Sequence, residues 1–213
     1  FLFVNFFMKK IILYIILGSS LAYTQWFNID QEGVTRTYYM SYPDNAIGPT
    51  PLIINMHGFG SNAQEQQLYS EMDQFAHSEN IAVVYPEGLN NAWNVFTFWD
   101  GNSYDDVDFI SAIIDDIAEN FNIDLNRVYA CGMSNGGYMS YRLACDLSSK
   151  IAAFGSVTGN FMINTEENDC LDQGREIPII HFHGTADEVV NYFPPSFDES
   201  LTVGESINFW SDY

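Results

Sequence analysis

Positive charge is the scarcest feature of this 213-residue sequence, which has 7 lysines and arginines against 28 aspartates and glutamates and a formal net charge of −21. Nucleic-acid backbones and anionic membrane surfaces are negatively charged, so they would repel such a chain. We therefore expect no nucleic acid among its partners. We interpret the acidic surface as a source of solubility.

The sequence also lacks an apolar run that would span a bilayer comfortably. Ile11–Leu17 is apolar but short, follows Met8-Lys9-Lys10, and precedes small residues that end at Ala22. This order is typical of a secretory signal peptide, with a membrane anchor as the alternative. We predict that residues 1–22 are the signal peptide, with spurious residues before Met8. The mature protein would then be secreted, extracellular or periplasmic, with no membrane association after cleavage.

Cysteine is rare, with only Cys131, Cys145 and Cys170. No spacing typical of a structural zinc site is present, and we predict no metal and no cofactor. An exported chain can form disulfides. Cys131 lies in an apolar segment and is expected to be a buried thiol, which leaves Cys145 and Cys170 as a possible pair.

Short apolar segments alternate with longer amphipathic ones from residue 51 onward. The predicted strands are 35–42, 51–56, 81–85, 127–132, 151–157 and 177–182, and the predicted helices are 64–80, 105–121 and 135–149. This alternation predicts an α/β fold with a mainly parallel sheet and helices on both faces. In such sheets function gathers at the carboxyl ends of the strands.

The motif Gly132-Met133-Ser134-Asn135-Gly136 lies between a predicted strand and a predicted helix. A strand, a tight glycine-flanked turn and a helix form the nucleophile elbow of serine hydrolases. The turn raises the serine hydroxyl above the sheet, and the helix N-terminus favours developing negative charge. We predict Ser134 as the catalytic nucleophile; the alternative is a glycine-flanked turn with an idle serine.

Acyl transfer also needs two hydrogen-bond donors for the oxyanion. One is the backbone N–H after the nucleophile, here Asn135, and the other comes from a loop after an earlier strand. The loop His57-Gly58-Phe59-Gly60 fits that position, and we predict Phe59 as its donor. An ordinary glycine-rich turn is the alternative, and His57 is expected to be structural.

A catalytic acid is expected after the strand 177–182, where His183-Gly184-Thr185-Ala186 leads to Asp187. An aspartate at this sheet edge can orient a histidine and stabilise its charged form. We predict Asp187 as the triad acid, with Glu188 as the nearest substitute and a simple turn-forming aspartate as the alternative.

Taken together, these motifs resemble the polyhydroxybutyrate depolymerase-type esterases, a group that includes feruloyl and acetyl xylan esterases. The resemblance spans about residues 30 to 192 and rests on the order and spacing of His57-Gly58-Phe59-Gly60, Tyr85-Pro86-Glu87-Gly88, Trp93-Asn94, Asp105-Asp106-Val107-Asp108-Phe109-Ile110, Gly132 to Tyr138, and His183 to Asp187. It implies an α/β-hydrolase fold and a Ser–Asp–His triad, carried over onto Ser134 and Asp187. It also implies a Cys145–Cys170 disulfide.

The sequence departs from that pattern at the catalytic base, the histidine of the triad. Its histidines are His57, His77, His181 and His183, and none follows Asp187. We therefore expect residues 23–213 to be a catalytic domain truncated at its C-terminus, without the last strand and the histidine loop, and nearly inactive as written. Recruitment of His181 or His183 is the alternative.

The expected function is secreted serine ester hydrolysis through an acyl-enzyme. The substrate would be a feruloyl or acetyl ester on polysaccharide, or a polyhydroxybutyrate-like polyester. Trp93 is predicted to contact it, within an aromatic wall with Phe96, Phe98 and Trp99 for which core packing is the alternative. The alternatives are a catalytically dead carbohydrate-binding or scaffolding relative and a peptidase on the same fold.

Overall fold

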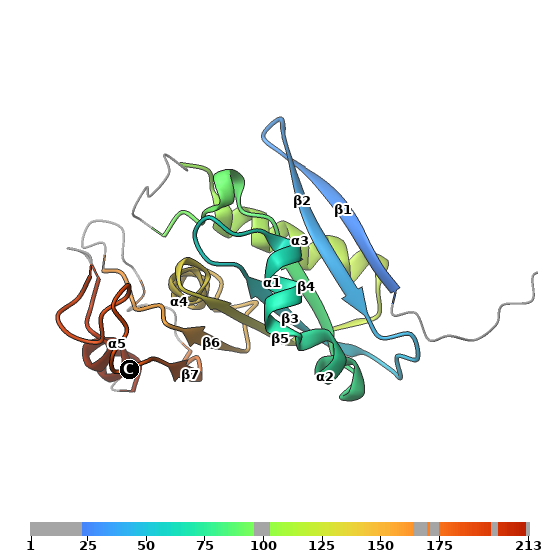
Figure 1. Ribbon diagram of the computed structural model, residues 1–213. Helices are drawn as coiled ribbons and strands as arrows, with labels where there is room; N and C mark the ends of the chain where they lie inside the picture. The colour runs from blue at the N-terminus through green and yellow to red at the C-terminus, as the bar shows by residue number, and fades with distance from the viewer. Residues whose placement is uncertain (1–22, 96–102, 164–169, 171–174, 197–199, 212–213) are drawn as a thin grey trace, which may run out of the picture.

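The computed structural model describes residues 23–95, 103–163, 170, 175–196 and 200–211. The predicted signal peptide and the aromatic residues 96, 98 and 99 lie outside the described residues. Within this part of the chain, strands form one sheet in the order β1-β2-β4-β3-β5-β6-β7 (Figure 1). The strands are β1 Tyr23–Gln31, β2 Val34–Tyr42, β3 Thr50–Met56, β4 Ala82–Pro86, β5 Ile123–Met133, β6 Ala153–Val157 and β7 Ile179–Phe182.

The predicted mainly parallel sheet is confirmed. The pairs β1–β2 and β2–β4 are antiparallel, whereas β3–β4, β3–β5, β5–β6 and β6–β7 are parallel. The helices are α1 Ala63–Ser70, α2 Met72–Ser78, α3 Asp106–Asn120, α4 Asn135–Asp146 and α5 Val203–Ser211, with a short 3₁₀ turn, η1, at Leu89–Asn91. The carboxyl ends of β3, β5, β6 and β7 therefore share one edge of the sheet.

Helices cover both faces of the sheet, as predicted (Figure 1). Successive side chains of a strand point to opposite faces. In β4, Val84 belongs to the large apolar cluster that contains the buried side chains of α3 and α4. Its neighbour Val83 packs in a separate cluster with Ala63 of α1 and Ala76 of α2. The two clusters are the two layers of core, one on each side of the sheet.

Two features of the fold differ from the predicted elements. Strand β1 was not predicted; it forms a hairpin with β2 through Glu32 and Gly33, whose φ angles are 52° and 80°. A two-residue turn with two positive φ angles matches the right-handed twist of a hairpin. The dipeptide Glu32-Gly33 was the available signal, and Asp30 supports the turn by accepting a hydrogen bond from the Gly33 N–H at 3.1 Å.

The predicted helix 64–80 is two helices, and this prediction was wrong at Glu71. Glu71 adopts a left-handed conformation with φ 48° and ends α1. Gln66 of α1 donates to Asn55 Oδ1 of β3 at 2.8 Å, and Tyr85 of β4 donates to Asp73 Oδ1 of α2 at 2.6 Å. Each short helix thus has its own polar contact with a different strand.

Cys145 of α4 is joined to Cys170 by a disulfide across a separation of 25 residues. This is the pairing that the family resemblance implies. Cys131 in β5 is a free thiol, and burial raises its pKa to about 12. No helix among the described residues is long and apolar enough to cross a membrane.

Candidate active site

Ser134 occupies a strained turn between β5 and α4. Its φ and ψ angles are 52° and −118°, a combination that residues with a Cβ rarely adopt. The turn is held on both sides, because the Ser134 N–H donates to Val157 O at 2.8 Å and the Tyr138 N–H donates to Ser134 O at 3.0 Å. A serine at a strained strand-to-helix turn is the geometry of the nucleophile elbow.

The loop 57–60 lies directly against this turn. A Cβ built on Gly58 would stand 3.6 Å from the Cβ of Ser134, an ordinary van der Waals contact, so the loop packs on the serine turn. Gly60, with φ 77°, turns the loop back, and its N–H donates to Asn91 O at 2.8 Å. Phe59 is 52% exposed, so the role predicted for it depends on its backbone N–H and not on its ring.

Asn135 supplies the other predicted donor. It is the first residue of α4, where the backbone N–H has no carbonyl four residues earlier in the helix to bind. Its side chain is fully buried and bonds to the backbone of Trp93. The structure therefore gathers Ser134, the loop carrying Phe59, and the N-terminus of α4 at one edge of the sheet.

His57 has the structural role that we expected. It is fully buried, its Nδ1 lies 2.8 Å from Gly58 O, and its Nε2 accepts from the Gly88 N–H at 2.9 Å. A backbone N–H can only donate, so Nε2 is unprotonated and the proton sits on Nδ1. Burial lowers the pKa of His57 to about 4 and keeps this ring neutral. Both nitrogens are thereby committed to the backbone of the site.

Trp93 departs from the prediction. It is 1% exposed, and its indole Nε1–H donates to His57 O at 2.9 Å. A side chain buried to this extent has no face for a substrate, so the structure gives it a role inside the site's framework. The predicted substrate contact is corrected to a contact with His57 and Asn135.

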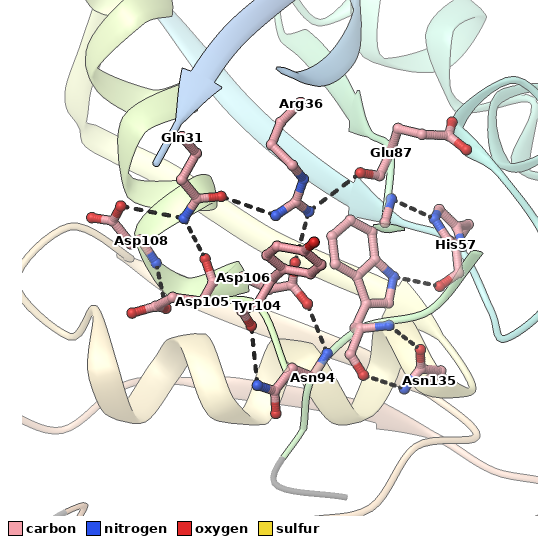
Figure 2. Close-up of polar contacts among 12 residues, drawn as sticks. Gln31, Arg36, His57, Glu87, Asn94, Tyr104, Asp105, Asp106, Asp108 and Asn135 are labelled. Carbon is pink, nitrogen blue, oxygen red and sulfur yellow. Dashed lines mark hydrogen bonds and ion pairs between the residues drawn. The ribbon is translucent and has the colours of Figure 1, made fainter. Parts of the chain in front are cut away.

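Behind Trp93 lies a buried ion pair that the sequence analysis missed. Arg36 of β2 donates to Asp106 Oδ1 at 2.7 Å, and both side chains are 0% exposed (Figure 2). The other oxygen of Asp106 accepts from the Asn94 N–H at 2.7 Å. The neighbouring Asp105 caps the N-terminus of α3, since its side chain accepts from the Asp108 N–H at 2.9 Å.

Asp187 follows β7 at the same sheet edge as Ser134. Its Oδ1 accepts from the N–H groups of Val189 and Val190, both at 2.9 Å. Its Oδ2 lies 4.0 Å from His183 Nε2. One carboxylate oxygen is thus fixed by the turn, and the other faces away from those two donors.

The two histidines near Asp187 bond to each other and to their surroundings. His183 Nε2 lies 2.7 Å from Val190 O, a pure acceptor, so this nitrogen carries the proton. His181 Nε2 lies 3.2 Å from His183 Nδ1, and the Tyr141 hydroxyl lies 2.8 Å from His181 Nδ1. Burial lowers the pKa of His181 to about 4. All four ring nitrogens of these two histidines thus have partners other than Ser134.

His77, the remaining histidine, lies on α2 and contacts Ser41 Oγ at 3.1 Å. The part of the chain that the structure describes holds no cluster of three or more His, Cys, Asp or Glu side chains that could bind a metal ion.

A sheet with antiparallel β1 and β2, parallel later strands, a serine elbow after β5 and an acid after β7 defines an α/β-hydrolase. Comparison with known proteins agrees. Residues 103–200 match the phospholipase/carboxylesterase family. The chain is 33% identical over 162 residues to the bifunctional acetylxylan esterase/xylanase XynS20E of Neocallimastix patriciarum. The aligned region covers 76% of this chain and 23% of that protein.

Feruloyl esterase B of Piromyces equi is 29% identical over 163 residues, or 74% of this chain and 30% of that protein. Among solved structures, the fluorophosphonate-binding serine hydrolase FphF of Staphylococcus aureus superposes with a TM-score of 0.63 at 18% identity, covering 79% of this chain and 81% of that one. The chain thus has the α/β-hydrolase fold and is homologous to acetylxylan and feruloyl esterases, which confirms the resemblance to that group. It spans 23% and 30% of the lengths of these two relatives.

Proposed function

We propose that this protein is a serine carboxylic ester hydrolase. The observation that carries the proposal is the strained backbone of Ser134, held at the N-terminus of α4 and against the glycine loop 57–60. A fold maintains such strain where a function requires it. The esterase names of the relatives support the same reaction class.

In the proposed reaction, Ser134 Oγ attacks the ester carbonyl carbon and the carbonyl oxygen becomes an oxyanion. The backbone N–H groups of Phe59 and Asn135 stabilise that charge. The tetrahedral intermediate collapses, the alcohol leaves with the serine's proton, and the acyl group stays on Ser134. Water then attacks the acyl-enzyme and releases the carboxylic acid.

The catalytic base is the part of the proposed mechanism that the geometry supports least. Asp187 is the triad acid of the proposal, but His183 and His181 direct their nitrogens to Val190, Tyr141 and each other. Without a base the serine is a weak nucleophile. We therefore propose slow turnover for residues 23–213 alone, with about 10³-fold catalysis over water from the oxyanion hole and binding.

For the substrate we propose an ester on plant polysaccharide, of the feruloyl or acetyl xylan type. The names of the relatives, an acetylxylan esterase/xylanase and a feruloyl esterase, support this choice. A polyhydroxybutyrate-like polyester is the second choice. Export is part of the proposal, supported by the leader-like order of residues 1–22. N-terminal sequencing of protein collected from the medium would test export.

A second candidate function is binding of such an ester or carbohydrate without turnover. The engagement of both histidines near Asp187 favours it. The intact elbow argues against it, because a binding protein gains nothing from the strain at Ser134. The two functions differ in whether Ser134 reacts covalently.

The test is to treat residues 23–213 with a fluorophosphonate probe and locate the label by peptide mass spectrometry. Labelling at Ser134, lost in Ser134→Ala and retained in Ser149→Ala, would support the esterase; Ser149 is an exposed serine after α4. Hydrolysis of p-nitrophenyl acetate, methyl ferulate and acetylated xylan would then rank the substrates. Carbohydrate binding with no labelling would replace the esterase with the binding function.

A further inference from the structure

We propose that Trp93 is a positioning residue that holds the two oxyanion donors at a fixed separation. The inference rests on the proposed function, because Phe59 and Asn135 are donors only in that reaction. The two donors belong to elements far apart in the sequence, the loop after β3 and the start of α4. Their separation must be fixed by a residue that contacts both elements, and Trp93 bonds to both.

The first bond pair joins Trp93 to Asn135. The Trp93 N–H donates to Asn135 Oδ1 at 2.6 Å, and Asn135 Nδ2 donates to Trp93 O at 3.2 Å. The carboxamide of Asn135 thus pairs with both backbone groups of Trp93 across a separation of 42 residues. Because this side chain is fully buried, the first residue of α4 is fixed in place by Trp93.

The second contact joins Trp93 to the other donor loop. Its indole Nε1–H donates to His57 O at 2.9 Å, and the indole packs on the His57 ring with centroids 4.9 Å apart. His57 Nε2 in turn accepts from the Gly88 N–H (Figure 2). Its Nδ1 bonds to Gly58 O. The loop that carries Phe59 is therefore held at its first residue by Trp93.

Trp93 is itself anchored from behind through Asn94. The Asn94 N–H donates to Asp106 Oδ2 at 2.7 Å, and Asp106 is paired with Arg36 (Figure 2). Arg142 of α4 donates to Asn94 O at 2.6 Å. The segment 93–94 is thus fixed by buried charge on one side and by α4 on the other.

Trp93 acts through its neighbours and does not touch the reacting atoms. Loss of a whole oxyanion donor costs roughly 10²- to 10³-fold in kcat. Loosening two donors while both remain present should cost less, about tenfold or more. Because the oxyanion forms only in the transition state, kcat should fall while KM changes little.

The test is Trp93→Phe, which removes the indole N–H and retains an aromatic ring. With p-nitrophenyl acetate we expect kcat to fall about tenfold or more and KM to stay within about twofold. The matched control is Trp210→Phe, the same change in a buried tryptophan of α5 that packs on Phe154 and Phe161. A kcat for Trp93→Phe equal to that of the control overturns the inference.

Amide hydrogen exchange provides a readout that does not depend on turnover. Peptides covering 57–61 and 134–138 should both exchange faster in Trp93→Phe, with no change in β5 or β6. If the wild type neither labels at Ser134 nor hydrolyses esters, the proposed function fails, and exchange still decides whether Trp93 couples the two segments. Unchanged exchange in both segments would overturn the coupling. Should Trp93→Phe not fold, Asn135→Asp, which retains the acceptor for the Trp93 N–H, takes its place in both measurements.

Discussion

Gly136, in the first turn of α4, lies so close to the end of β3 that a Cβ on it would stand 2.3 Å from Met56 O and 2.7 Å from His57 O. Real Cβ atoms do not approach backbone oxygens this closely, so the start of α4 is seated on the end of β3 only because residue 136 has no side chain. This contact brings the serine turn and the glycine loop together.

Gly136→Ala should therefore disrupt the elbow. A methyl group here meets backbone atoms that cannot move aside, and overpacking of this kind costs about 2 kcal/mol or more. Urea unfolding and probe labelling of Ser134 would measure the loss of stability and reactivity. The control is Gly204→Ala in α5, where a Cβ would have no neighbour within 4 Å. Equal stability of the two variants would contradict the close seating.

The buried pair Arg36–Asp106 should be costly to break from one side. Arg36→Met leaves the Asp106 carboxylate buried without its cation, which typically costs about 3–5 kcal/mol. The double variant Arg36→Met/Asp106→Asn should lose less than the sum of the two single changes.

The comparison for this pair is Lys150→Met, which breaks the Lys150–Asp115 pair, whose side chains are 30% and 64% exposed. Exposed pairs contribute at most about 1 kcal/mol. Urea unfolding of the four variants at one pH provides the measurement. If the loss of unfolding free energy in the double variant equals the sum of the losses in the two single variants, the two buried charges do not interact.

The Cys145–Cys170 disulfide should stabilise the fold mainly by restricting the unfolded chain. For a separation of 25 residues the expected contribution is about 3 kcal/mol, lost in Cys145→Ser/Cys170→Ser. Mass spectrometry of the unreduced protein after alkylation should find one free thiol, Cys131. Three alkylated cysteines in protein purified without reductant would show that the pair does not form.

Acid should destabilise the fold through two histidines. Burial lowers the pKa of His57 and of His181 from an ordinary value of 6.5 to about 4. Between these values the unfolded chain binds more protons than the folded one, so the free energy of unfolding falls as pH falls from about 6.5 to about 4. Below that window these two groups add no further loss.

Nuclear magnetic resonance of the histidine ring protons would follow each titration directly. We expect His57 and His181 to titrate near pH 4. Urea unfolding between pH 7 and pH 4 should show the matching decline in stability. Titration of both rings near pH 6.5 would contradict the burial and the bonds to Gly88 and Tyr141 that keep them neutral.

Local patterns in the sequence were sufficient for much of the fold. Buried parallel strands are continuous apolar runs, so β3, β4 and β6 were predicted to within a few residues. The elbow at Ser134 was also predictable, because a strand, a glycine-flanked serine and a helix are adjacent in the chain. Asp187 could be placed by the same means, since it follows the apolar strand β7, whose carboxyl end lies at the shared edge of the sheet.

What the sequence by itself determined was therefore the set of elements and the residues that follow each strand. Only the tertiary structure decided how distant residues pair. Arg36 and Asp106 are 70 residues apart, and Trp93 and Asn135 are 42 apart, so no local pattern connects them. The burial of Trp93 and the bond between Tyr141 of α4 and His181 of β7 follow from packing between elements. Such contacts depend on three-dimensional proximity, which the order of residues along the chain does not display.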